Sequence, residues 1–144
     1  MTEKNVKVKL SDVSVKDWKT VGMPAEAANA IDGDPQTVWT AKALTPLVVD
    51  MGKASEVIGF SYAPAQKEDL TGTIYKYNFY VSIDGKNWTK CDASGEFSNI
   101  MHNPVPYFVR FGKKYPARYF KLEPVAEINN KPATTVGEVG ILLK

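Results

Sequence analysis

Hydrophobic and polar residues alternate with a period of two along much of this chain. In Thr73–Ile83, aromatic and aliphatic side chains occupy most odd positions and polar side chains occupy most even positions. This pattern predicts a β-strand with one buried and one hydrated face, because successive side chains of a strand point to opposite sides. The Asp84-Gly85 pair that follows predicts a tight hairpin turn, since glycine tolerates the positive φ of such turns.

Short segments of the same character recur along the chain, separated by glycine and proline. Only Pro24–Ile31, an alanine-rich stretch that begins with proline, has helical character. Many strands without long helices predict an all-β sandwich or barrel, and we expect a single domain over residues 1–144. The other expected strands are Val6–Leu10, Leu47–Met51, Val57–Tyr62, Tyr107–Phe111, Arg118–Glu123 and Val136–Leu143.

Length, charge and cysteine content narrow the classes of function. The chain has 144 residues, enough for one domain with its own core. Its net charge is only +2 and its basic residues are scattered, so the basic stripe that tracks nucleic acid is missing and no nucleic-acid partner is expected. Cys91 is the only cysteine, which excludes an intrachain disulfide and a zinc site built from thiolates.

The sequence has no obvious membrane or export segment. No apolar run approaches the ~20 residues that span a bilayer, so no membrane insertion is expected. The first ten residues also lack the apolar core of a signal peptide. Two interpretations follow, a cytoplasmic protein or a piece of a longer secreted chain, and the shortage of catalytic side chains favours the second.

One short segment has the composition of a cation-binding loop. Asp32, Gly33, Asp34 and Thr37 place two carboxylates, a glycine and a hydroxyl within six residues, directly after the helical stretch. Hard cations such as calcium take six to eight oxygen ligands, which a tight loop supplies through side chains and carbonyls. The alternative is an Asx turn, in which the two aspartates accept hydrogen bonds from nearby backbone amides. On the residues alone both interpretations stay open.

The amino-acid sequence of this segment resembles the early signature of the coagulation factor 5/8 type C, or discoidin, domains. More closely, it is similar to the bacterial carbohydrate-binding modules of family 32, as appended to bacterial β-hexosaminidases of the chitobiase type and to α-fucosidases. The similar motifs follow the family order over nearly the whole chain. They are Asn29–Trp39, Leu47–Gly52, Gly59–Pro64, Gly72–Tyr77, Tyr80–Trp88, Gly95–Ile100, Ala117–Leu122 and Gly137–Ile141.

The resemblance implies a fold and a metal. The family fold is an eight-stranded jelly-roll β-sandwich of the galactose-binding-domain-like type, in agreement with the strand pattern. Many members hold one structural Ca²⁺, which would tie the last strand to the first loop. Carried over position by position, its ligands would be the carboxylates of Asp32 and Glu138, the carbonyls of Asn29, Asp34 and Gly137, and the carbonyl and hydroxyl of Thr37.

The galactose-binding positions of the family are not matched. Galactose-type members have a histidine, an arginine, an asparagine and aromatic residues where this chain has Thr40, Ala43, Ala65, Leu70 and Ala133. Sugar recognition needs flat aromatic rings for C–H faces and planar polar groups for hydroxyls. The galactose pocket therefore does not transfer to this chain, and any ligand has to be recognised by other side chains.

Several side chains on the corresponding loops remain as candidate ligand contacts. They are Trp18, Lys42, Gln66, Lys67, His102 and Asn103. Trp18 lies in a polar stretch and could be an exposed stacking platform. The favoured alternative is a ring folded over the end of the sandwich or packed against a catalytic domain that this chain does not contain. Trp39 and Trp88 are expected in the core.

We expect a non-catalytic module that brings a tethered glycosidase, such as a β-N-acetylhexosaminidase, to its glycan. One histidine and one cysteine leave little for a catalytic triad, and a cation would occupy the available carboxylates. The expected partners are a glycan or the module's own N-terminal catalytic domain, in a monomeric protein that is periplasmic, extracellular or on the cell surface. The alternative is a degenerate module that acts only as a spacer or docking domain, and phospholipid or protein binding is a weaker third.

Overall fold

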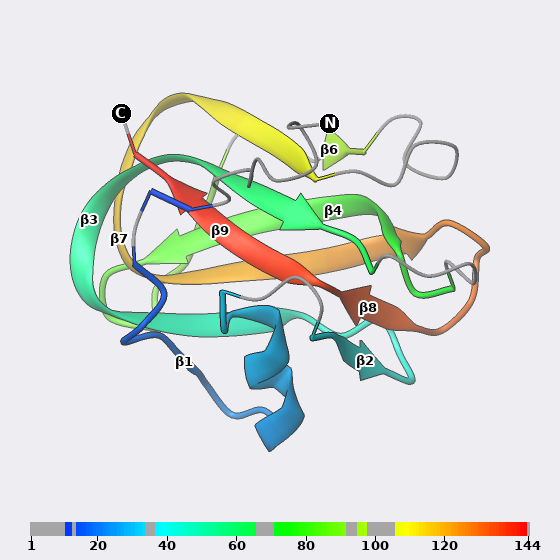
Figure 1. Cartoon of the computed structure of the whole chain (residues 1–144). Helices are drawn as coiled ribbons and strands as arrows, with labels where there is room; N and C mark the ends of the chain where they lie inside the picture. Colours follow the sequence, from blue (N-terminus) through cyan, green and yellow to red (C-terminus); the bar gives the residue numbers. More distant parts are fainter. Residues whose placement is uncertain are drawn as a thin grey trace, which may run out of the picture.

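The computed structural model describes residues 11–12, 14–33, 37–65, 71–91, 95–97 and 106–143, and these form a β-sandwich (Figure 1). The described residues contain nine strands and one 3₁₀ helix, Ala25–Ala30. The strands are β1 (Lys19–Thr20), β2 (Trp39–Ala41), β3 (Leu47–Ala63), β4 (Ile74–Ser82), β5 (Thr89–Lys90), β6 (Gly95–Glu96), β7 (Tyr107–Glu127), β8 (Thr134–Val136) and β9 (Glu138–Leu142). No helix of this described part has the length and apolar character to cross a membrane.

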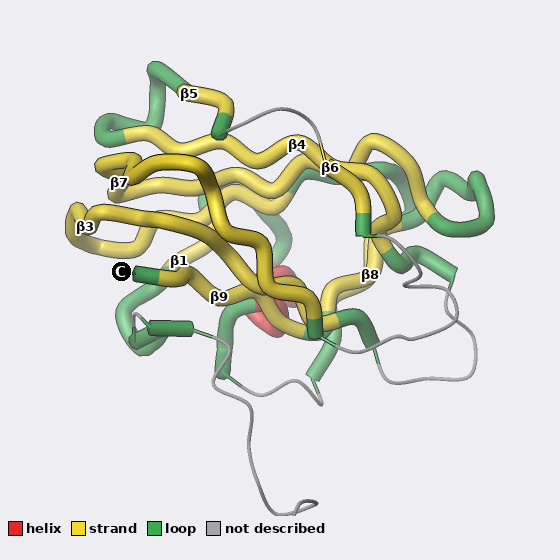
Figure 2. The backbone as a smooth tube through the Cα atoms, turned by 90° about the horizontal axis from the view of Figure 1, so that it is seen from above, coloured by secondary structure: helices red, strands yellow, loops and turns green. Residues whose placement is uncertain are grey.

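Two long strands, β3 and β7, take part in both layers of the sandwich. In one layer, the end of β3 pairs with β9 and with the beginning of β7. In the other, the beginning of β3 pairs with β1 and with the end of β7, which continues to β4 and its short partners β5 and β6. Strands β2 and β8 form a separate antiparallel pair. Figure 2 shows the bends of β3 and β7 at the left end of the molecule and β8 at the right.

The bends coincide with breaks in the pairing register. The register between β3 and β7 shifts between Asp50 and Ser55 and again between Val57 and Gly59. Bulges of this kind increase the local twist, so one strand turns from one layer into the other. Each long strand therefore contains two of the segments that the alternation pattern predicted as separate strands, 47–51 with 57–62 and 107–111 with 118–123.

An ion pair connects the two long strands beside the first register shift. Arg118 donates from Nε and Nη2 to the two carboxylate oxygens of Asp50, at 2.9 and 3.1 Å. Hydrogen bonding by Arg118 is the main reason that the pKa of Asp50 lies below its ordinary value, and the backbone N–H of Gly52 contributes in the same direction. This bidentate geometry is the strongest form of a surface ion pair.

Aromatic rings from the two layers meet in the core. Phe60 on β3 stacks on Phe79 of β4, with ring centroids 4.2 Å apart and planes 9° apart. Phe97 stacks on Tyr62 and Tyr77 at 4.9 and 4.6 Å. Burying such rings supplies most of the hydrophobic free energy of a domain of this size.

The fold confirms the predicted all-β sandwich. The stretch Pro24–Ile31 is helical as expected, and it forms a 3₁₀ helix over Ala25–Ala30. Trp39 is buried as expected, but Trp88 is not in the core: it is partly exposed, with the Lys121 ammonium 4.7 Å from its ring centre. The expected strand Val6–Leu10 lies outside the described residues.

Candidate functional site

The structure brings together the two parts of the chain that the resemblance predicted to meet. Glu138, at the start of β9, is 2% exposed. Its Oε2 accepts a hydrogen bond of 2.8 Å from the backbone N–H of Gly33, the residue next to Asp32. The loop after the 3₁₀ helix is thus fastened to the last strand across 105 positions of sequence.

The same loop gathers oxygen atoms. The hydroxyl of Thr37 hydrogen-bonds with Oδ2 of Asp32 and lies 3.3 Å from the carbonyl oxygen of Asn29. The described residues bring no three His, Cys, Asp or Glu side chains into one cluster. A cation here would therefore need carbonyl and hydroxyl oxygens besides its carboxylates. An all-oxygen set of this kind suits a hard cation such as calcium.

The remaining expected ligands are distributed as follows. Gly137 precedes Glu138, and its backbone N–H donates to the Ala63 carbonyl at 2.9 Å. A Cβ on Gly137 would come within 2.8 Å of that same carbonyl oxygen, so only glycine fits at this crossing. Asp34 lies outside the described residues. The ligands that the structure does place, Asn29, Asp32, Thr37 and Glu138, all offer oxygen donors, the chemistry that a hard cation needs.

A buried carboxylate organises the loop that follows β7. Glu127, the last residue of β7, is 2% exposed. Its Oε1 accepts hydrogen bonds from the backbone N–H groups of Asn129 and Lys131, at 2.7 and 2.8 Å. Its Oε2 accepts from the N–H of Gly72 at 2.7 Å. One side chain therefore shapes the 128–131 turn and fastens it to the chain just before β4.

Thr134, the first residue of β8, holds the loop between β2 and β3. Its hydroxyl donates to the Ala43 carbonyl at 2.8 Å and accepts from the Thr45 N–H at 2.9 Å. Thr134 is 1% exposed, so both hydrogen bonds are shielded from water. The 42–46 loop is consequently fixed to the same short strand that closes the 128–133 loop.

Thr135 and Tyr62 fix the entry to β4. The backbone N–H of Thr135 donates to the Gly72 carbonyl at 2.8 Å, and the Tyr62 hydroxyl donates to the Thr135 carbonyl at 2.8 Å and accepts from the Ile74 N–H at 3.0 Å. Burial raises the pKa of Tyr62 and keeps its hydroxyl protonated as a donor. Gly72 has φ of +95°, and a Cβ there would lie 2.1 Å from the Thr135 hydroxyl oxygen. Only glycine fits at this position.

A groove of about 440 Å³ lies between the two fastened loops. Its lining includes Leu44 from the 42–46 loop, Val125 from β7, and Asn130, Lys131 and Pro132 from the loop after β7. Leu44 and Val125 are 40% and 47% exposed. We call this hollow the loop-end groove.

The structure places the sequence-predicted ligand contacts unequally. Lys42 is exposed on the loop that carries Leu44. Trp18 is not an exposed platform: it is 7% exposed and packs edge-on against Phe120, with centroids 5.4 Å apart. The favoured interpretation of Trp18, a ring folded over the sandwich, therefore agrees with the structure. Four further candidates lie outside the described residues, namely Gln66, Lys67, His102 and Asn103.

Four of the five positions vacated in the galactose pattern lie among the described residues, and Leu70 lies outside them. Thr40 and Ala43 are exposed on β2 and the loop after it, Ala133 is half-buried next to β8, and Ala65 is only 2% exposed. Small side chains here leave no ring or planar donor of the expected kind. Sequence reasoning missed the residues of the loop-end groove. It also missed Glu127 and its hydrogen bonds to the backbone, which we call the Glu127 clamp. The one available signal was an acidic residue, Glu127, separated by a single residue from an Asn-Asn-Lys-Pro stretch typical of a turn.

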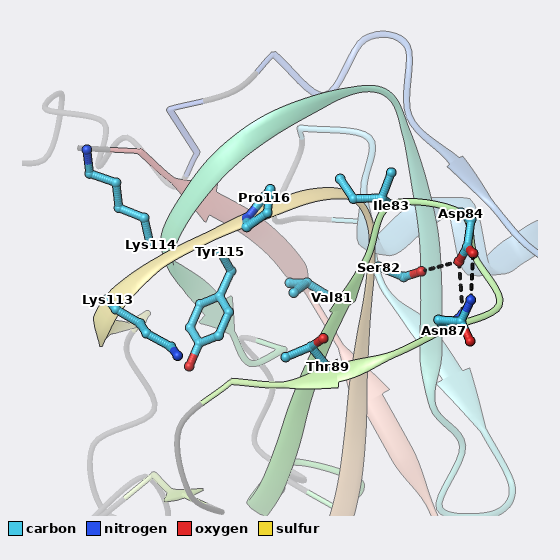
Figure 3. Close-up of a pocket in the computed structure, with 10 residues that line it drawn as sticks. All are labelled: Val81, Ser82, Ile83, Asp84, Asn87, Thr89, Lys113, Lys114, Tyr115 and Pro116. Carbon is cyan, nitrogen blue, oxygen red and sulfur yellow. Dashed lines mark hydrogen bonds between the residues drawn. The ribbon is translucent and has the colours of Figure 1, made fainter.

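A second groove, of about 430 Å³, lies at the β4–β5 hairpin and the bend of β7 (Figure 3). Asp84 faces it but is engaged in its own turn, where it accepts from the N–H groups of Lys86 and Asn87 at 2.8 and 2.9 Å. These bonds, that from Asn87 first, lower the pKa of Asp84. Lys113 lies over the Tyr115 ring, 5.4 Å from its centre. This groove is distant from the fastened loops, and we call it the hairpin groove.

Comparison with known proteins places this geometry in a family. A model of the F5/8 type C domain matches residues 9–139. Among curated proteins, the galactose oxidase of Gibberella zeae is 29% identical over 91% of this chain. The chain spans about a fifth of the length of the curated relatives it matches, 20% for this one.

Solved structures show the same fold. CpGH89CBM32-5 from Clostridium perfringens, in complex with GalNAc-β-1,3-galactose, has a TM-score of 0.77 at 22% identity, covering 91% of this chain and 99% of its own. The C-terminal domain of a chitobiase from Bacteroides fragilis has a TM-score of 0.73 at 22% identity, with coverages of 90% and 95%. A protein assigned as an α-L-fucosidase from Bacteroides ovatus is 33% identical over 96% of this chain and 20% of its own, with a TM-score of 0.72. The match over residues 9–139, on a sandwich with this strand order, shows that the chain belongs to the F5/8 type C domain family.

Proposed function

We propose that this domain is a non-catalytic carbohydrate-binding module and that its glycan binds at the end of the sandwich formed by the 42–46, 71–73 and 128–133 loops. The observation that carries the proposal is the joint fastening of these loops by Glu127, Thr134 and Thr135 beside an open groove. A prearranged site loses less conformational entropy when a ligand binds. Family membership and the sugar-bound relative support the same conclusion.

The module would act by tethering. Individual binding of a short glycan can be weak, because a linked catalytic domain experiences an effective substrate concentration that is on the order of millimolar. We propose that the parent protein is a glycoside hydrolase such as a β-N-acetylhexosaminidase, secreted to the periplasm or the cell surface. The chitobiase and α-L-fucosidase relatives support this parentage. The coding sequence on either side of this domain tests it directly, since it should encode a glycosidase domain.

We propose that the loop of Asn29, Asp32 and Thr37, together with Glu138, holds a structural Ca²⁺. Bound calcium would neutralise the carboxylates and fasten the loop to β9, so it would stabilise the fold rather than react. Isothermal titration of the chelated protein with Ca²⁺ should show one site, and the midpoint of thermal unfolding should rise with calcium. Asp32→Asn should weaken this response, whereas Asp12→Asn, at the opposite end of β9 from Glu138, should leave it unchanged. An equal response in both variants would contradict the assignment.

A glycan array with the isolated domain tests the main proposal. Binding should be detected for at least one glycan class and should weaken in Asn130→Ala, while Lys113→Ala in the hairpin groove should bind as the wild type does. Binding that depends on Lys113 and not on Asn130 would place the ligand at the wrong end. Both variants change exposed side chains, so their folding can be matched by circular dichroism.

The second candidate function is docking without sugar binding. It is favoured by the vacated positions, Thr40 and Ala133 among them, and by the exposure of Leu44 and Val125. In that case the array stays blank, and Leu44 and Val125 become protected from solvent when the neighbouring domain is attached. Hydrogen exchange of the isolated domain against the longer protein separates the two functions.

A further inference from the structure

Apolar side chains form much of the lining of the hairpin groove. Ile83, directly after β4, is 52% exposed, the highest value among the large hydrophobic residues in the described part of the chain. Val81, Tyr115 and Pro116 line the groove with it (Figure 3). Tyr115 is buried and packs edge-on against Phe111, with ring centroids 5.6 Å apart, so this wall is anchored in the core. Exposed apolar groups that gather at a hollow indicate a contact surface more strongly than isolated ones do.

The groove arises where two paired strands separate. Strands β4 and β7 pair as far as Ser82 and Tyr119. On the far side of this pair, β4 enters its hairpin turn, whereas β7 is paired with β3 at Tyr115 and Pro116. The hairpin wall is fixed as well, because the Ser82 hydroxyl accepts from the N–H of Gly85 at 2.8 Å. Two fixed walls make a prearranged surface, which loses little conformational entropy when a partner binds.

The charged groups of the groove differ in what they already bind. The Asp84 carboxylate is engaged by its own turn, where it takes part in two backbone and two side-chain hydrogen bonds. Lys114 forms an exposed ion pair with Glu56 at 3.8 Å, a kind that contributes little. Among the described residues no carboxylate pairs with Lys113, whose ammonium lies over the ring of Tyr115. The groove thus keeps a cationic donor beside its aliphatic surface.

The position of the groove leaves the loop end free. It lies at the end of the sandwich where β3 and β7 bend, and β8 with its loops lies at the other end (Figure 2). An occupant of the hairpin groove and a glycan at the loop end therefore do not compete. In the curated galactose oxidase and the α-L-fucosidase, the region matched by this chain is about a fifth of the polypeptide, 20% in each case, so most of those chains lies beside such a domain.

We propose that the hairpin groove is a docking site for an acidic surface of a neighbouring domain in the same polypeptide, with a carboxylate at Lys113 and an aliphatic side chain on Ile83. Charge complementarity carries the choice of partner, since a carboxylate supplies what Lys113 lacks and fixes the orientation of the contact. A docked module would hold its loop end in one direction relative to that neighbour. The inference rests on the proposed parentage and adds to it the surface by which the module is held.

Hydrogen exchange of the longer protein tests the docking. Amide exchange would be compared between the isolated domain and the longer protein by mass spectrometry. Peptides that cover 81–90 and 112–117 should exchange about tenfold more slowly in the longer protein, which corresponds to a docked population of roughly 90%. Peptides that cover 42–46 and 128–133 should exchange equally in both. Protection of the 42–46 and 128–133 loops in place of the hairpin would put the neighbour at the loop end and overturn the inference.

Matched lysines locate the contact. In the longer protein, Lys113→Glu reverses the charge at the groove and should remove most of the protection, because like charges across an interface repel. The control is Lys76→Glu, which should retain the protection of the wild type. Lys76 is an exposed lysine that also lies over a tyrosine ring, 5.8 Å from the centre of Tyr75, but does not line the groove. Ile83→Thr should lower the docking equilibrium constant by roughly fourfold, the factor for one buried methylene.

The outcomes separate this inference from the function on which it rests. If the longer protein contains a glycosidase domain and exchange at the hairpin groove is unchanged, or if Lys113→Glu and Lys76→Glu behave alike, the docking is wrong and the carbohydrate-binding function stands. If the flanking sequence encodes no further domain, the proposed parentage and the docking both fail. An isolated domain that sediments as a dimer, and as a monomer after Lys113→Glu, would assign the groove to a second copy and overturn the inference. Thermal unfolding of each variant shows whether lost protection reflects lost folding.

Discussion

Replacement of Glu127 by glutamine tests the clamp that shapes the binding end. Glutamine has the same size but only one acceptor oxygen. If that oxygen takes the Oε1 position, it keeps the N–H groups of Asn129 and Lys131, and the new NH₂ group then faces the N–H of Gly72. We therefore expect Glu127→Gln to preserve the 128–131 turn and to release the chain before β4.

The magnitude follows from the three hydrogen bonds. A buried donor that loses its acceptor costs about 1–3 kcal/mol. The two bonds that remain change from charge-assisted to neutral, and charge-assisted bonds are about twice as strong. Removing a buried charge recovers part of its desolvation cost. The free energy of unfolding should thus fall by about 2–3 kcal/mol, a large part of the ~5–15 kcal/mol by which domains are stable.

Urea unfolding monitored by tryptophan fluorescence measures this loss, and Glu123→Gln is its control. Glu123 is half-buried on the same strand, and its Oε1 accepts only from the side chains of Asn78 and Tyr80, at 2.9 and 3.2 Å. A glutamine oxygen can accept both bonds, so this variant should lose less than about 1 kcal/mol. If Glu127→Gln is no more destabilising than Glu123→Gln, the clamp does not hold the loops as described.

Three further predictions concern the fold. Phe60→Ala removes a ring stacked between the layers and should lower the free energy of unfolding, measured in urea, by about 3–5 kcal/mol. Phe108→Ala, at a position that is 44% exposed, should lower it by less than about 1 kcal/mol. Similar losses in the two variants would contradict the placement of Phe60 in the core. Gly72→Ala should cost at least about 2 kcal/mol because of its positive φ and the overlap of the new Cβ with a threonine hydroxyl, while Gly112→Ala, into open space, should change stability by less than about 1 kcal/mol in the same assay. Arg118 holds the pKa of Asp50 below its ordinary value, so the stabilisation from this pair is complete above about pH 4 and is lost as the pH falls through the lowered pKa. Asp50→Asn should therefore reduce the loss of stability at acid pH. An unchanged acid limb of the stability-against-pH curve would refute the role of the pair.

The strands could be predicted from the sequence because successive side chains of a strand alternate between its buried and its hydrated face. In β4 the buried residues Tyr77, Phe79 and Val81 follow the predicted alternation. Ile74 is buried although it belongs to the opposite set, because register shifts near Lys76 turn this part of the strand over. A bulge adds a residue without a marker in the alternation, and so the continuity of β3 and β7 could not be predicted either.

One long-range contact was predictable because a family motif carried it, and the loop-end groove was not. The meeting of the Asp32 loop with Glu138 came from the resemblance, and the 2.8 Å bond between Gly33 and Glu138 shows that contact. The loop-end groove depends on which loops lie side by side. Leu44 and Val125 are 81 positions apart, and no periodicity links them. The sequence also could not decide whether Trp18, which has polar neighbours, is exposed. Its packing on Phe120 in the folded structure shows that it is buried.

The most direct test of the central claim is a map of backbone amide shifts during titration with the glycan that binds most tightly. The account predicts chemical-shift changes that cluster in the 42–46, 71–73 and 128–133 loops and no changes around the hairpin groove. Shifts confined to the hairpin and the bend of β7, or no shift with any glycan, would contradict it.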